Sequence, residues 1–156
     1  MEELNTDVTR DIYPMPAFVT FAVADVERTV DFYVGALDFV ELFRMPGPGG
    51  GAALVHLRRW RYQDILVRPG PAEVGHGWGV SIAALAEDLP ALVERARAHG
   101  GGEVSDPTDT PWNTRDVNIT DPDGYRLVYT ARRPEGERDE AFGARIVALA
   151  REQLGT

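Results

Sequence analysis

The sequence predicts an α+β fold built from two βαβββ modules and followed by a helical C-terminal tail. The main observation is an internal repeat, in which the stretch that begins at Ala22 (AVADVERTVDFY) is echoed by the stretch that begins at Leu85 (LAEDLPALVERA). In each copy a short apolar strand leads to an aspartate, an amphipathic helix follows, and another strand begins soon after the glycine near the helix end. A repeat at roughly half the domain length indicates two similar modules packed together.

Five segments follow from this pattern. Residues 1–15 are expected to form an N-terminal arm, 16–69 the first module, 70–77 a linker rich in proline and glycine, 78–131 the second module, and 132–156 the helical tail.

The first module shows a helix followed by three strands. Alternating residues predict a strand over Ala17–Val23, and Asp25 is placed to cap a helix whose apolar positions share one face. Three more strands are expected over Phe39–Phe43, Ala53–Arg58 and Asp64–Val67.

The second module repeats this order. A strand is expected over Trp78–Ala83, Asp88 is placed to cap a helix that ends near Gly100, and a short strand follows near Glu103–Ser105. A long loop over 106–113 then leads to two strands joined by the turn sequence DPDG, in which proline and glycine occupy strong turn positions. These two strands are Val117–Thr120 and Leu127–Ala131.

The tail has apolar residues every three to four positions between Glu137 and Leu154, which predicts a helix. This helix could pack over a sheet or contribute to a dimer contact.

Length and composition are those of one globular domain. The chain has 156 residues, of which 44% are hydrophobic, and it has no cysteine, which excludes disulfides and thiolate metal sites. Its polar N-terminus and the lack of a long apolar run predict neither a signal peptide nor a membrane span, so we expect a cytoplasmic protein without a membrane partner. The formal charge of −9 disfavours nucleic acid as a partner and favours neutral or cationic molecules.

The two modules, the aspartate at the start of each helix and the DPDG turn before the last strand resemble the vicinal oxygen chelate superfamily. This is the glyoxalase, bleomycin-resistance and extradiol dioxygenase group. The resemblance covers about residues 16–131 and is most specific over residues 110–127 (TPWNTRDVNITDPDGYRL). It implies that the sheets curve into an open barrel with a cleft, and that the protein is a homodimer.

Enzymes of this family hold a divalent metal in the cleft, where it binds two adjacent substrate oxygens. Counting from the helix-starting aspartates and from the DPDG turn places the four metal-ligand positions at Phe18, Ile65, Ser81 and Val128. None of these is an ordinary transition-metal ligand, and a shift of one residue offers only Asp64. The resemblance therefore implies no metal or other cofactor, and a cleft lined by apolar and aromatic groups.

Aromatic residues near loops are candidates for stacking on a flat ligand. Trp60 and Tyr62 fall in a strand connection, Trp78 opens the second module and Trp112 precedes a strand, although each could equally fill the core or an interface. The full set of predicted ligand-binding residues is Phe18, His56, Trp60, Tyr62, Trp78, Ser81, Trp112, Asn113, Arg115 and Val128.

Two polar members of this set have alternative roles. His56 either points into the cavity or is an ordinary strand residue. Arg115 either orients a ligand or pairs with an aspartate, the choices being Asp106, Asp109 and Asp116.

Three functions are consistent with these observations. The first hypothesis is a metal-free homodimer that binds an aromatic small molecule, such as a cationic antibiotic or a metabolite, by sequestration, as in the bleomycin-resistance branch. The second is a glyoxalase-like lyase or isomerase with a displaced metal site that uses His56, Asp64 or His76. The third is a scaffold or regulatory module whose C-terminal helix contacts a partner. No catalytic residue is predicted, because the sequence shows no spacing typical of acid–base or nucleophilic groups.

Overall fold

Two sheets with the same topology form the molecule. The computed structural model describes residues 18–60, 63–71 and 79–155. The first sheet has the order β1–β4–β3–β2 and the second the order β5–β9–β8–β6, with a short β7 also paired to β8. In both, the first strand of the module runs parallel to the last, and the remaining pairs are antiparallel. This arrangement confirms the βαβββ repeat.

The strands of the first sheet are β1 (Val19–Val23), β2 (Val40–Pro46), β3 (Ala52–Arg58) and β4 (Asp64–Pro69). Those of the second are β5 (Val80–Ala84), β6 (Glu103–Val104), β7 (Thr108–Asp109), β8 (Thr114–Thr120) and β9 (Arg126–Arg132). The expected loop over 106–113 therefore contains a strand, because β7 pairs with the start of β8, which begins earlier than predicted.

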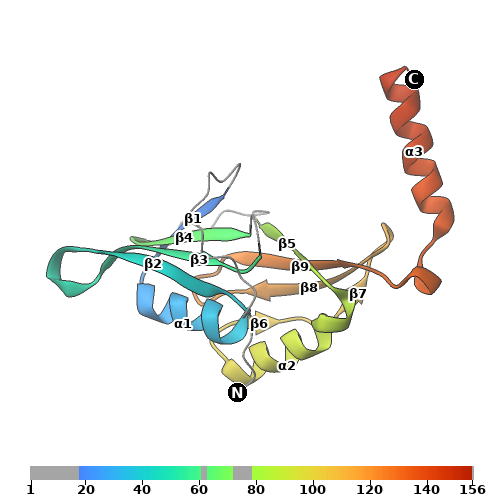
Figure 1. The fold of residues 1–156 in the computed structure, drawn as a ribbon. Helices are drawn as coiled ribbons and strands as arrows, with labels where there is room; N and C mark the ends of the chain where they lie inside the picture. Colours follow the sequence, from blue (N-terminus) through green and yellow to red (C-terminus); the bar gives the residue numbers. More distant parts are fainter. Residues whose placement is uncertain (1–17, 61–62, 72–78, 156) are drawn as a thin grey trace.

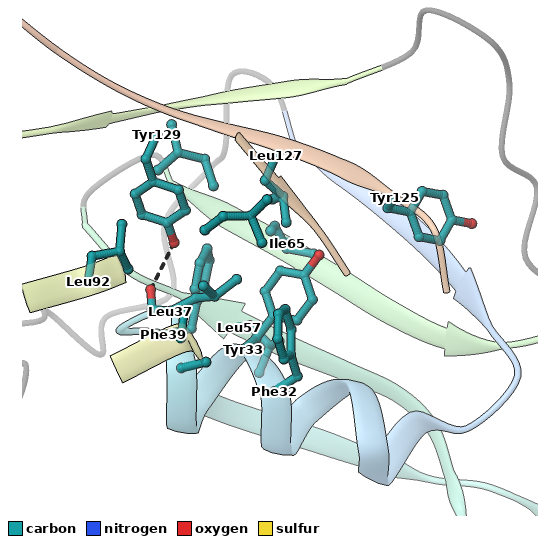
Figure 2. Close-up of a cluster of buried hydrophobic side chains, with 14 of the residues drawn as sticks. Phe32, Tyr33, Leu37, Phe39, Leu57, Ile65, Leu92, Tyr125, Leu127 and Tyr129 are labelled. Carbon is teal, nitrogen blue, oxygen red and sulfur yellow. Dashed lines mark hydrogen bonds between the residues drawn. The ribbon is translucent and has the colours of Figure 1, made fainter. Parts of the chain in front are cut away.

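The helices α1 (Val26–Ala36) and α2 (Leu89–His99) lie side by side and cover one face of the sheets (Figure 1). Their apolar faces join the inner faces of both sheets in one core. Figure 2 shows this core, including the hydrogen bond of 2.9 Å that the Tyr129 hydroxyl donates to the carbonyl oxygen of Leu37. The two modules therefore share their hydrophobic interior rather than folding as separate units.

The two helix starts differ. Asp25 caps α1 as expected, since its side chain accepts a hydrogen bond of 3.0 Å from the Arg28 backbone N–H. The prediction that Asp88 caps α2 is wrong, because a 3₁₀ turn over Ala86–Asp88 runs directly into this helix. Asp88 thus has helical dihedral angles and its side chain makes no capping bond.

The DPDG turn ties the second module to the first. Its first aspartate, Asp121, accepts a hydrogen bond of 3.0 Å from the Tyr33 hydroxyl of α1. Tyr125, which follows the turn, stacks on Phe21 with 4.2 Å between ring centroids and donates to the carbonyl oxygen of Ala22. Gly124 has a φ of +91°, a value that favours glycine at this turn position.

Helix α3 (Glu140–Leu154) follows a 3₁₀ turn over Glu135–Glu137 and projects away from the sheets (Figure 1). Three of its apolar side chains are about half exposed: Ile146 at 48%, Val147 at 51% and Leu149 at 49%. Among the described residues, no helix has the length and apolarity needed to cross a membrane.

Candidate functional site: a cavity at the seam of the two sheets

A cavity of about 280 Å³ opens where β1 and β4 of the first sheet meet β5 of the second. We call it the seam cavity. Its lining is mainly apolar, with three polar side chains, and consists of Phe18, Val19, Phe39, Gln63, Asp64, Ile65, Val80, Ser81 and Ile82. Two of the predicted ligand-binding residues, Phe18 and Ser81, are therefore brought together here from the two copies of the repeat.

The strand register shows which residues share a face at the seam. Val19 pairs with Ile65, and both side chains are directed toward the helix-covered core. The residues directly before them, Phe18 and Asp64, therefore lie on the opposite face, because side chains alternate along a strand. Ile65, the position expected from the sequence, therefore faces the core, and its neighbour Asp64 lies on the face that Phe18 shares.

Asp64 is held by two basic side chains. Arg58 donates to both of its oxygens, over 2.8 Å from Nε and 2.9 Å from a terminal nitrogen. His56 Nε2 lies 3.0 Å from Asp64 Oδ2. All three side chains are buried, and Arg58 is fully so. His56 and Arg58 alternate along β3 with core residues, so they point to the same face as Asp64.

The four equivalent positions do not fit a divalent metal. Phe18 and Val128 have no donor atom, and Ser81 offers a neutral hydroxyl, a poor ligand for such an ion. Asp64 is the one carboxylate at these positions, and both of its oxygens already accept bonds from the buried guanidinium of Arg58. Across the described part of the chain, no three His, Asp or Glu side chains come together as a metal site.

A polar link joins the modules beside the seam cavity. Arg59 and Gln63 flank the β3–β4 connection and donate hydrogen bonds of 2.7 and 3.0 Å to the carbonyl oxygen of Ala83 in β5. Burial lowers the pKa of Arg59, whose guanidinium carbon lies 4.2 Å from the Trp60 ring centroid. Arg59 therefore contacts one face of the indole and also bonds to the second sheet.

Trp60 lines a second and larger cavity, of about 670 Å³, which we call the rim cavity. It begins where the seam cavity ends along β5, because residues 80–82 line the first and 83–84 line the second. Its other walls are the segment after β5, the start of β8, the end of β9 and the connection to α3.

The other predicted residues lie elsewhere. Trp112 is 56% exposed and lines neither cavity. Asn113 holds the start of α3, since its amide donates to the Asp139 carbonyl oxygen and accepts from the Asp139 N–H.

Arg115 forms ion pairs with Asp109, at 2.6 Å from Nε, and with Glu137, so of its two predicted roles the structure shows pairing with an aspartate. Val128 pairs with Ser81 across β5 and β9 but does not line the seam cavity.

Three positions named from the sequence, Tyr62, Trp78 and His76, lie outside the described residues. His56 lies on the sheet face opposite the helices, where its ring contacts Asp64. It is not among the residues that line the seam cavity, so it does not point into that cavity.

Sequence reasoning missed Arg58, Arg59 and Gln63. The signal for Arg58 was available, because His56 and Arg58 alternate with apolar residues in a strand whose hairpin partner begins with Asp64. Charged residues at facing positions of a buried hairpin predict a paired cluster. For Arg59 and Gln63 no such signal existed, since their acceptor is a backbone carbonyl of the other module.

Comparison with known proteins agrees with this architecture. The family model described as Glyoxalase/Bleomycin resistance protein/Dioxygenase superfamily matches residues 16–129. The uncharacterized proteins Mb0911c of Mycobacterium bovis and Rv0887c of Mycobacterium tuberculosis are each 32% identical over 112 residues. That alignment covers 66% of this chain, 74% of the first relative and 66% of the second.

Solved structures share the fold at low sequence identity. A glyoxalase/bleomycin resistance protein/dioxygenase from Nocardioides superposes with a TM-score of 0.57 at 24% identity, covering 83% of this chain and 89% of that one. The fosfomycin resistance protein FosX from Listeria monocytogenes superposes with a TM-score of 0.62 at 15% identity, covering 81% of this chain and all of that one.

Proposed function

Because the chain belongs to the Glyoxalase/Bleomycin resistance protein/Dioxygenase superfamily, we propose that it binds an aromatic small molecule in the seam cavity without metal and without chemistry. The observation that carries this proposal is the donor set at the four family positions. Asp64 is neutralised by buried Arg58, and its three counterparts are a phenyl ring, a hydroxyl and an alkyl group. Such a site can sequester a molecule but offers no Lewis acid from these positions.

The lining supports an aromatic ligand. Phe18 is 50% exposed at the cavity mouth, which leaves a ring face available for stacking. Phe43 of β2 lies opposite His56 of β3 in the strand register, and its side chain is 39% exposed. It adds a second partly exposed ring to the first sheet. Ser81 supplies a polar anchor in this lining, while the Gln63 amide is already bonded to Arg59 and to the Ala83 carbonyl oxygen. A micromolar complex requires only about −8 kcal/mol, which a few such contacts can provide.

The charge of −9 supports a cationic ligand, such as a positively charged antibiotic or metabolite, because a negative field raises its local concentration. Asp64 is already paired with Arg58, so it offers a cationic ligand no direct ion pair. The attraction of a cationic ligand therefore comes from the overall negative charge of the chain and acts over a long range. A cationic ligand should therefore bind more weakly as salt is added, while a neutral analogue should not.

We also propose that the protein is a homodimer through α3. A single 15-residue helix is marginally stable in water, and the half-exposed Ile146 and Leu149 lie one turn apart on this helix. Packing against the same helix of a second copy would cover this stripe, with Phe142 extending it toward the helix start.

A thermal-shift screen tests the function. The panel should contain aromatic antibiotics, with bleomycin as the first probe, each measured with EDTA and with added Mn²⁺. We expect at least one compound to raise the Tm equally in both conditions. A compound that raises the Tm only with Mn²⁺ would instead support the lyase or isomerase hypothesis.

A further inference from the structure

The rim cavity is a second site with a charge opposite to that of the chain. Its floor is apolar, with Ala84, Leu85 and Pro134 among the lining residues and Trp60 at one wall. Its charged side chains are Arg132, Arg138 and Glu87, two positive and one negative, for a local charge of +1. The whole chain carries −9, so the lining of this cavity is more positive than the chain as a whole, while the outer sides of the same arginines face a neighbouring hollow that also contains Glu135, Asp139 and Glu140.

The two arginines are available to a ligand. Arg132 is exposed and makes no side-chain hydrogen bond or ion pair within the described part of the chain. Arg138 donates its Nε hydrogen to the Arg133 carbonyl oxygen over 2.6 Å, which fixes the side chain while leaving its terminal nitrogens unpaired among the described residues. An anchored guanidinium with unused donors is suited to a carboxylate, because its fork geometry matches the two carboxylate oxygens.

Trp60 is suited to hold an apolar body. Arg59 lies against its ring at 4.2 Å, and Arg59 is itself fixed by its hydrogen bond to Ala83. The indole is therefore preorganised, which lowers the entropy cost of stacking a ring on it.

From this arrangement we propose that the rim cavity binds a small organic carboxylate with a flat apolar body. The body lies against Trp60 and the apolar floor, and the carboxylate is held by Arg132 and Arg138. Glu87 opposes the anion, so it limits affinity and selects against ligands with a second negative charge. This site is separate from the seam cavity and does not depend on the function proposed for it.

The test is isothermal titration calorimetry of the full chain with 2-naphthoate and with its neutral isostere 2-naphthamide. We expect 2-naphthoate to bind the unaltered protein and 2-naphthamide to bind about tenfold more weakly or not at all. Arg132→Gln and Arg138→Gln should each weaken 2-naphthoate binding about fivefold or more, whereas Glu87→Gln should strengthen it.

Two controls make the result specific. Arg126→Gln removes an exposed charge at the other end of β9 and should leave the Kd unchanged. Ser81→Trp fills the seam cavity and should also leave 2-naphthoate binding unchanged. No binding of 2-naphthoate, equal binding of the amide, equal losses in the Arg126 variant, or loss in the Ser81 variant would each overturn the proposal. Circular dichroism and the Tm of every variant confirm that the fold is intact.

Discussion

The hydroxyl of Thr29 in α1 donates a hydrogen bond of 3.0 Å to Oδ2 of Asp123, a residue 94 positions further along the chain. The other oxygen of Asp123 accepts from the Ala24 N–H at 3.3 Å and from Arg28 at 3.1 Å. The last aspartate of the DPDG turn therefore binds the start of the helix in the opposite module. The Asp123 side chain is 3% exposed, whereas that of its partner Arg28 is 49% exposed.

Replacing this aspartate should destabilise the junction of the modules. We expect Asp123→Ala to lower the free energy of unfolding by about 1–3 kcal/mol, because the Ala24 N–H and Arg28 lose this acceptor and the Thr29 hydroxyl keeps only its second one, a backbone carbonyl oxygen of the same module. Urea unfolding at neutral pH measures this change. Asp106→Ala is the matched control, since Asp106 is 82% exposed and should cost less than about 0.5 kcal/mol. Equal losses in the two variants would contradict the assigned role of Asp123.

Tyr33 should make the protein sensitive to alkali. Its burial, and then the carboxylate of Asp121, raise the pKa of Tyr33 well above the ordinary value of 10.0. Because the folded state retains this proton more tightly, stability is fully present below about pH 10 and is lost as the pH rises further. Burial likewise raises the pKa of Tyr129, which adds to the same loss.

Tyr33→Phe separates this effect from ordinary packing. The variant should be less stable at neutral pH, since Asp121 loses a hydrogen-bond donor, yet its stability should decline less steeply above about pH 10. Urea midpoints measured from neutral to alkaline pH give both quantities. Parallel curves for the variant and the unaltered protein would show that Tyr33 is not the group responsible.

The buried pair of Arg58 and Asp64 should show strong coupling. Asp64→Leu alone removes the carboxylate that pairs with the fully buried Arg58 guanidinium and should cost about 3–5 kcal/mol. The double variant Arg58→Met/Asp64→Leu replaces the pair with apolar groups and should be more stable than the single Asp64 variant. Chemical unfolding of the variants in a double-mutant cycle measures the coupling, and additive losses would contradict it.

The fold was largely predictable because each module carries its own local signals. Asp25, the buried face of α2 and the DPDG turn were recognised from spacing alone, and all three have their expected local geometry. Asp88 was misassigned since the repeat suggested a cap, whereas an added 3₁₀ turn places it inside helical backbone. Local patterns cannot show such a turn, because it depends on how β5 joins the helix.

The site was less predictable than the fold. Phe18 and Ser81 could be placed at the seam because they occupy equivalent positions of the repeat. The role of Asp123 could not, as its partners come from the other module and no periodicity relates them. The same holds for the rim cavity, whose walls come from several segments that meet only in the folded chain.

Helix α3 should control oligomeric state. Ile146→Glu adds a charge to the apolar stripe and should convert a dimer to a monomer, because burying an unpaired carboxylate is costly. Ala144→Glu adds the same charge on the opposite face of the helix and should remain dimeric. Light scattering after size-exclusion chromatography reports the mass of each. A monomeric unaltered protein, or identical masses for the two variants, would refute the proposed interface.

The proposed function requires the seam cavity to hold a ligand without a metal. Its most direct measurement is calorimetric titration of the strongest compound from the thermal-shift screen into the unaltered protein, Ser81→Trp and Ala98→Trp. Both substitutions are at exposed positions, but Ser81 alone lines the cavity. We expect about one-to-one binding that EDTA does not change, that the Ala98 variant retains and that the Ser81 variant loses. Binding that disappears with EDTA, or that survives in the Ser81 variant, would contradict it.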